Sequence, residues 1–129
     1  MDRNVETALE WFRLAADQGF VLAMANIADT YFRGDGIAQD YVLAEQWYRM
    51  AAKGGDSEAQ YFMGRIFVEG LGVTADPLQG YAWYAIAADS GEERAIRARE
   101  ELESQFDTSQ RAQADKRLAQ CLATALKEC

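Results

Sequence analysis

Residues 40–55, DYVLAEQWYRMAAKGG, decide the fold of this 129-residue chain, because the same pattern occurs three times. The chain aligns with itself at a spacing of 36 residues without a gap, so that residues 4–19 and 76–91 are copies of the quoted stretch. A tryptophan, an aromatic neighbour, a pair of alanines and a closing glycine recur at fixed positions. Repeats of this length are typical of solenoids and propellers, in which each unit packs on the next.

Each copy of the quoted stretch is expected to form one helix. Asp40 can accept hydrogen bonds from the first free backbone amides, and Asn4 and Asp76 stand at the same repeat position. Pro77 suits the first turn, where its missing amide costs nothing. Gly55 and its counterparts in the other copies are expected to end these helices.

The apolar residues of these helices follow the i, i+3, i+4, i+7, i+8 rule, which places them on one face. That face is expected to be core, and we expect the recurring aromatic side chains to pack there rather than to stack on a ligand. The aromatic set consists of Trp11, Trp47, Trp83, Tyr48 and Tyr84.

A second helix is expected over residues 57–69, SEAQYFMGRIFVE. Its small residues, Ala59 and Gly64, would let a neighbouring helix approach closely. Helices of this length are marginal alone in water, so the stacking of repeats has to supply their stability.

The connector RGDGIAQD, residues 33–40, resembles a phosphate loop, a calcium loop or an adhesion signal at first sight. In its copy, residues 69–76, EGLGVTAD, the two glycines, the branched aliphatic residue and the final Asp return, whereas Arg33, Asp35 and Gln39 do not. Only the features that shape a backbone turn are therefore repeated. We interpret the stretch as a turn between helices.

The pattern A-x-x-W-[FY]-x-x-A-A-x-x-G, followed by [YF]-x-x-G-x-G-[IV]-x-x-D, resembles the Sel1-like repeat, a relative of the tetratricopeptide repeat. The resemblance covers residues 4–95 and implies an all-α, right-handed α/α superhelix. We expect one solenoid domain over residues 1–129. Its units would be repeats at about 4–39, 40–75 and 76–106, and a capping helix at about 107–128, with Asp107 or Thr108 as its N-cap.

The two cysteines, Cys121 and Cys129, fall on the apolar stripe of the expected capping helix. Eight helical residues would separate them by about 12 Å along the axis, which is beyond the reach of a disulfide unless the last turn frays. We expect them to be buried packing thiols, and a redox pair is the alternative.

Composition excludes several classes of function. The chain contains no histidine, which removes the commonest general base and metal ligand, and no nucleophile motif is present. We therefore expect no enzyme activity, no metal and no cofactor. The net charge of −8 disfavours nucleic acid and anionic lipid, and no apolar run is long enough to span a membrane.

The start of the chain, MDRNVETALEW, lacks the features of a signal peptide. If the chain is complete, a cytoplasmic location is expected. If an N-terminal signal has been trimmed, a periplasmic or secreted location is open.

In tetratricopeptide-like solenoids the first helix of each repeat lines the concave surface, so the resemblance implies a groove here. Its expected partner-binding positions are Glu6, Glu10, Arg13, Asp17, Val42, Gln46, Arg49, Lys53, Leu78, Ala82, Ala85 and Asp89. Arg49 and Lys53 would pair with acidic groups of a partner. The alternative is an ordinary solvated face whose apolar end is covered by the C-terminal helix.

The resemblance implies a protein-interaction module, an adaptor or scaffold that holds a partner protein or peptide in this groove. The acidity of the chain favours a partner with a basic surface. A dedicated inhibitor, such as an immunity protein that blocks a toxin, is the alternative.

Overall fold

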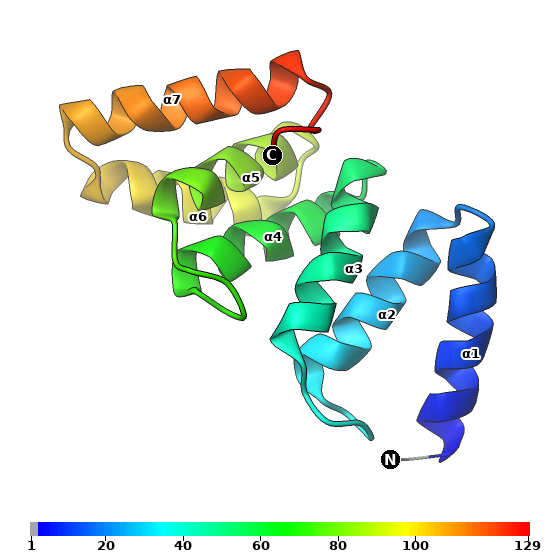
Figure 1. The fold of residues 1–129 in the computed structure, drawn as a ribbon. Helices are drawn as coiled ribbons and strands as arrows, with labels where there is room; N and C mark the ends of the chain where they lie inside the picture. Colours follow the sequence, from blue (N-terminus) through cyan, green and yellow to red (C-terminus); the bar gives the residue numbers. More distant parts are fainter. Residues whose placement is uncertain (1–2) are drawn as a thin grey trace.

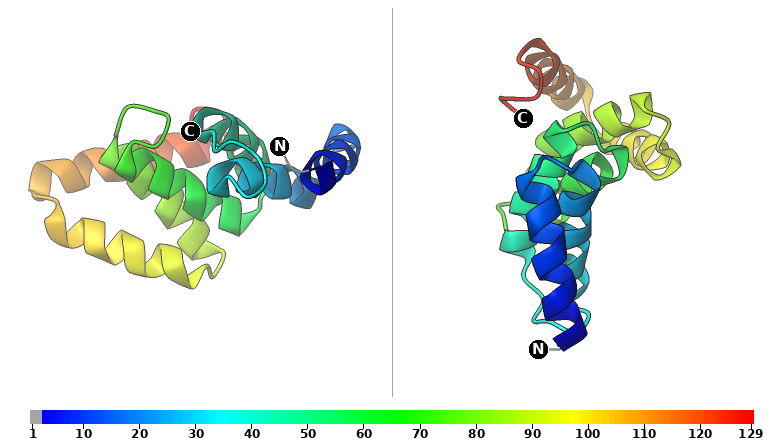
Figure 2. Two further views of the ribbon diagram at one scale, coloured as in Figure 1. Left: turned by 90° about the horizontal axis from the view of Figure 1, so that it is seen from below. Right: turned by 90° about the vertical axis from the view of Figure 1, so that its right-hand side faces the viewer.

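The computed structural model describes residues 3–129, and within them seven α-helices follow one another without a strand. The helices are α1 (Arg3–Asp17), α2 (Val21–Arg33), α3 (Tyr41–Lys53), α4 (Ser57–Glu69), α5 (Pro77–Asp89), α6 (Glu93–Gln105) and α7 (Thr108–Ala123). They progress from α1 at one end of the molecule to α6 and α7 at the other (Figures 1 and 2). The expected all-α solenoid is confirmed.

Side chains cap the helices where the sequence indicates. The Asp40 carboxylate accepts from the backbone N–H of Leu43 at 3.0 Å, and Asp107 forms a capping box with Gln110 at the start of α7. The prediction that Asn4 caps the first helix is wrong. Because α1 begins at Arg3, Asn4 already lies inside its first turn.

The two connectors have the same backbone geometry, which confirms that they are turns. All four of their glycines adopt the left-handed conformation, with φ of 70°, 75°, 70° and 72° at Gly34, Gly36, Gly70 and Gly72. The next helix is anchored in the same way in both copies. The N–H of Asp40 donates to the Tyr31 carbonyl at 3.0 Å, and that of Asp76 donates to the Phe67 carbonyl at 2.8 Å.

The core runs between successive repeats, because the second helix of one repeat packs on the first helix of the next, α2 on α3 and α4 on α5. Gly64 on α4 permits this approach. A Cβ atom there would overlap the ring of Tyr84 on α5. Trp83 and Tyr48 are fully buried in the resulting layers, and Trp47 is half-buried.

Trp11 does not follow the expectation for the aromatic set, since 67% of its surface is exposed. Among the described residues, the main packing partner of α1 is α2. The side of α1 that corresponds to the covered sides of α3 and α5 has no helix against it. The prediction that Trp11 is a core residue is therefore wrong for this chain.

The predictions for the C-terminus also need correction. The last helix ends at Ala123 rather than near residue 128, and Ala125 and Leu126 adopt the left-handed conformation with φ of 52° and 69°. The N–H of Leu126 then donates to the Cys121 carbonyl at 2.8 Å, which turns the chain back. The Cα atoms of Cys121 and Cys129 lie 4.9 Å apart and the two residues form a disulfide, so they are not free thiols.

Candidate partner-binding face

The twelve expected positions lie along α1, α3 and α5, and we call the sides of these helices that bear them the groove face. All four positions on α1 are exposed. Arg13 is turned toward the second helix of its own repeat, because its Nη2 donates to the hydroxyl of Tyr31 at 2.9 Å. Glu6, Glu10 and Asp17 therefore give this end of the groove face an acidic character.

On α3, Val42, Gln46 and Lys53 are exposed as expected, but Arg49 is not available as a simple cation. Its guanidinium lies 2.5 Å from the Glu45 carboxylate and 5.9 Å from the centre of the Phe67 ring. Glu45 thus neutralises the Arg49 member of the expected basic pair, because it lies one turn before Arg49 on the same helix, whereas Lys53 stays exposed.

On α5 the expected positions are mostly inaccessible. Ala82 and Ala85 are 0% and 2% exposed, Leu78 is half-buried beside Leu102 and Phe106, and Asp89 alone remains exposed. Both α6 and α7 pack against α5, so this helix is buried on all sides. The apolar end of the expected groove is covered by the C-terminal helix, as the alternative interpretation has it.

Sequence reasoning missed two exposed apolar residues beside the expected positions. Leu14 and Met50 are 55% and 45% exposed. Leu14 and Met50 occupy the same repeat position, one turn after Glu10 and Gln46. Their recurrence is visible in the sequence, but an apolar residue type by itself indicates a place in the core rather than on the surface.

The C-terminal turn reaches the groove face between α3 and α5. Nη1 of Arg49 and Nε2 of Gln79 both donate to the carbonyl oxygen of Cys129, at 3.2 and 3.1 Å. Arg117 on α7 secures the same region, since its Nη1 donates to Asp76 at 2.8 Å and to Oε1 of Gln79 at 3.2 Å. The sequence contains one sign of this polar contact, because Gln79 stands at the repeat position where the middle copy has the apolar residue Leu43.

The Asp76 carboxyl joins the start of α5 to α7. Burial raises the pKa of Asp76, but the hydrogen bond from Arg117 and those from the backbone N–H groups of Gln79 and Leu78 outweigh it. The net result is a pKa below the ordinary value. The ionised form of Asp76 is therefore favoured in the folded protein.

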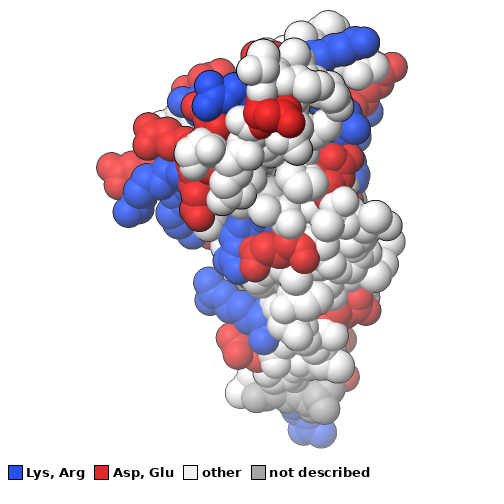
Figure 3. Space-filling model, turned by 90° about the vertical axis from the view of Figure 1, so that its left-hand side faces the viewer, with Lys and Arg blue, Asp and Glu red and all other residues white. Residues whose placement is uncertain are grey.

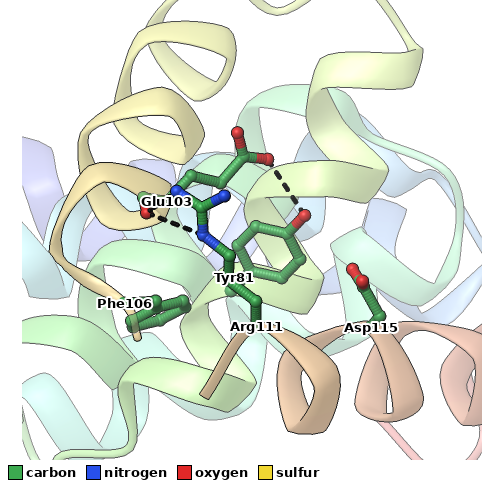
Figure 4. Close-up of a pocket in the computed structure, with 5 residues that line it drawn as sticks. All are labelled: Tyr81, Glu103, Phe106, Arg111 and Asp115. Atoms are coloured by element: carbon green, nitrogen blue, oxygen red, sulfur yellow. Dashed lines mark hydrogen bonds between the residues drawn. The ribbon is translucent and has the colours of Figure 1, made fainter. Parts of the chain in front are cut away.

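A cavity of about 330 Å³ lies between α5, α6 and α7 (Figure 4). The Tyr81 hydroxyl donates to Glu103 at 3.1 Å, and Nη2 of Arg111 donates to the Glu103 carbonyl at 2.7 Å. Burial, and then Glu103, raise the pKa of Tyr81 to about 12, so its hydroxyl stays protonated and serves as a donor. The contacts of these three residues tie the helix junction together.

One face of the molecule shows how charged side chains are distributed there (Figure 3). On the face shown in Figure 3, Lys and Arg lie beside Asp and Glu rather than gathering in one basic area. Within residues 3–129, no cluster of three or more possible metal-ligating acids or cysteines is present. No helix in the same range is long and apolar enough to cross a membrane.

Comparison with known proteins identifies the repeat. The family model described as "Sel1 repeat" matches residues 1–20, 21–56 and 57–92. The chain belongs to the Sel1 repeat family. Proteins of this family are generally protein-interaction modules and typically non-enzymatic scaffolds.

Two solved Sel1 repeat structures resemble this one. The first is a protective antigen of uropathogenic Escherichia coli strains that displays an SLR fold, with 30% identity and a TM-score of 0.86. The match covers 98% of this Sel1 repeat chain and 28% of the antigen, so the chain spans little more than a quarter of that protein. The second is a Sel1 repeat protein from Oxalobacter formigenes, with 36% identity, a TM-score of 0.69, and 71% and 69% of the two chains covered. No curated protein matches the sequence.

Proposed function

We propose that this Sel1 repeat protein is an adaptor that holds an amphipathic helix of a partner protein against α1 and α3. The observation that supports the proposal is the distribution of exposed apolar side chains. Of the seven large exposed apolar residues in the described part of the chain, three lie on or beside the groove face of these two helices, and we call them the apolar strip. They are Leu14, Val42 and Met50.

The spacing of these residues suits an apolar helix face. Val42 and Met50 are eight residues apart on α3, so they follow one side of that helix, and Leu14 on α1 occupies the same repeat position as Met50. Clusters of exposed apolar side chains with polar surroundings mark interaction sites on soluble proteins. Repeat proteins use their extended faces in this way.

Charge favours a partner helix with basic flanks. The exposed carboxylates of Glu6, Glu10 and Asp17 border the apolar strip on α1, and the whole chain has a net charge of −8. Such a field attracts basic segments and repels acidic ones. Arg49 contributes little opposite charge, because Glu45 already pairs with it.

The binding surface of the proposal is shorter than the twelve expected positions. Ala82 and Ala85 are buried, and the C-terminal turn lies over the groove face between α3 and α5. We therefore assign partner binding to Glu6, Glu10, Asp17, Val42, Gln46 and Lys53, together with the newly found apolar residues.

An oxidising compartment, periplasmic or extracellular, is the location we propose. The disulfide between Cys121 and Cys129 supports it, because structural disulfides persist mainly outside the reducing cytosol. Titration of free thiols in protein isolated under alkylating conditions tests the proposal. Two free thiols per chain would point to the cytoplasm instead.

An affinity capture with matched variants tests the proposed function. The bait Leu14→Glu, Met50→Glu places charges in the apolar strip, whereas the control Phe20→Glu, Leu22→Glu changes two equally exposed apolar residues at the start of α2. We expect the partner to be retained by the wild type and the control and to be lost from the strip variant.

Retention of the same partners by the strip variant would contradict the proposal. Capture of one enzyme in a tight one-to-one complex, with loss of its activity, would identify an inhibitor in place of an adaptor.

A further inference from the structure

The C-terminal turn, residues 124–129, occupies part of the groove face in the manner of a bound peptide. Leu126 and Cys129 are half-buried against the main core cluster, whereas Ala125, Lys127 and Glu128 are exposed. Leu126 therefore supplies an apolar contact, and Cys129 supplies contacts through its sulfur and its carbonyl oxygen. This is the pattern of a short peptide ligand with a single anchoring side chain.

Two donors converge on one oxygen atom of this turn. Nη1 of Arg49 on α3 and Nε2 of Gln79 on α5 reach the carbonyl oxygen of Cys129 from different repeats. Gln79 is itself oriented by Arg117, which donates to its Oε1 at 3.2 Å. Preoriented donors from rigid helices form a site for an oxygen acceptor, either a main-chain carbonyl or a terminal carboxylate.

The disulfide is the principal restraint on the turn. Ala125 and Leu126 are not glycines, yet both have φ in the left-handed region, where a side chain is disfavoured. Three of the six residues are exposed and bury little apolar surface. Without the bond to Cys121, which is 1% exposed and fixed in the core, the turn would depend on its hydrogen bonds and on the packing of Leu126.

We propose that Arg49 and Gln79 form a peptide-binding site, which residues 124–129 occupy in the oxidised protein and vacate when the disulfide is reduced. The ligand is a partner peptide with an aliphatic side chain in place of Leu126 and an oxygen acceptor in place of the Cys129 carbonyl. The site extends the groove face toward α5, but the proposal does not depend on the function assigned to α1 and α3.

Release requires a dithiol reductant. A thiolate of the reductant attacks Sγ of Cys129, the more accessible sulfur, and Cys121 departs as a thiolate that takes up a proton. The second thiol of the reductant then attacks the mixed disulfide and frees Cys129. The protein gains two electrons and two protons, and the reductant becomes a disulfide.

The first test measures release of the turn in the full-length protein. Cys129→Ser removes the disulfide and leaves Cys121 packed in the core. We expect hydrogen exchange of residues 124–129 to accelerate about tenfold or more in this variant, while α3 to α6 keep their protection. Unchanged exchange in the turn would overturn the proposal, because the turn would then stay docked without its disulfide.

The second test measures ligand binding, with the fluorescein-labelled peptide ATALKES as the probe. It copies residues 123–129 with serine in place of cysteine. We expect it to bind a variant that ends at Ala123, in which no tethered copy of the turn competes, and not the oxidised wild type. An amidated version distinguishes the two acceptors, since loss of binding would identify a carboxylate and retention a carbonyl.

Matched arginine variants in the background that ends at Ala123 assign the site. Arg49 and Arg65 each pair with a glutamate one turn away and lie near aromatic rings, but Arg49 alone reaches the turn. We expect Arg49→Met to weaken peptide binding about tenfold or more and Arg65→Met to leave it unchanged. Equal affinity in the two variants, or no peptide binding to the protein that ends at Ala123, would overturn the assigned site.

Discussion

Trp11, Trp47 and Trp83 occupy one repeat position and three different environments. Trp83 is fully buried, Trp47 is half-buried and Trp11 is 67% exposed. The difference follows from the position of each repeat in the stack, since no helix of the described residues covers the side of α1 that is equivalent to the covered sides of α3 and α5. An identical residue therefore has a structural role in one copy and is available for binding in another.

The three tryptophans give a prediction about stability. Trp83→Ala should lower the free energy of unfolding by about 3–5 kcal/mol, because it empties a buried site. Trp11→Ala should change it by no more than about 0.5 kcal/mol, as is usual for exposed positions. Urea unfolding followed by circular dichroism measures both, and equal losses would contradict the environments described here.

At the scale of elements, the close packing of α4 on α5 depends on the absence of a side chain at Gly64. In the first copy the same position is Ala28, which is fully buried between α2 and α3. The second interface is therefore tighter than the first. The ring of Tyr84 fills the space that a methyl group at position 64 would need.

This packing predicts the effect of Gly64→Ala. In an exposed helix such a change stabilises by about 1 kcal/mol. Here overpacking against Tyr84 should reverse the sign and destabilise the protein by about 1–3 kcal/mol. Chemical unfolding measures the change in unfolding free energy. A stabilised variant would contradict the prediction, because it would mean that α4 and α5 accommodate the methyl group without strain.

The contact between Asp76 and Arg117 predicts how α7 contributes to stability. Asn retains the capping function of Asp but not its charge. Asp76→Asn should therefore cost about 0.5–1 kcal/mol more than Asp40→Asn at pH 7, because it also loses a partly exposed ion pair. The Asp40 variant serves as the matched control.

The pKa of Asp76 fixes the pH dependence of that difference. A carboxyl whose pKa is lower in the folded state stabilises the protein above its unfolded pKa and loses this effect as the pH falls. The difference in unfolding free energy between the two variants should shrink below about pH 4. A difference that grows on acidification would have the wrong sign for the ion pair.

Most of the fold could be predicted from the sequence, because the repeat fixes helix length, spacing and turn chemistry together. The bounds of α4 and the caps at Asp40 and Asp76 follow from local residue types. The C-terminal turn could not be predicted in this way. Its path depends on two non-glycine residues with positive φ and on a disulfide, and neither leaves a periodic pattern.

The candidate site could be predicted only in part, for a similar reason. Periodicity identifies which side of α5 corresponds to the groove face of α1 and α3. It contains no information about whether another helix covers that side. Ala82 and Ala85 are buried by contacts with helices far along the chain, and Trp11 is exposed because such contacts are missing.

At the scale of the whole molecule, the structure describes a solenoid with one covered end and one open end. The helices α6 and α7 close the stack over α5, whereas the outer side of α1 has no helix on it among the described residues. The apolar strip lies toward the open end and is bordered by carboxylates. Together these features favour a basic amphipathic helix as the partner.

The carboxylates that border the apolar strip predict that partner binding depends on salt concentration. If basic flanks of the partner contribute to binding, raising the salt concentration from about 0.05 to about 0.5 M should weaken the complex severalfold through screening. The remaining affinity should come from the apolar contacts. Affinity that does not change with salt would remove the basis for basic flanks but not for the strip itself.

The most direct test of the proposed binding face is a hydrogen-exchange footprint of the protein with its captured partner. We predict added protection of α1 and α3, residues 3–17 and 41–53, with α2, α4 and α6 unchanged. Protection confined to those second helices, or to α7 alone, would contradict the assignment of partner binding to the groove face.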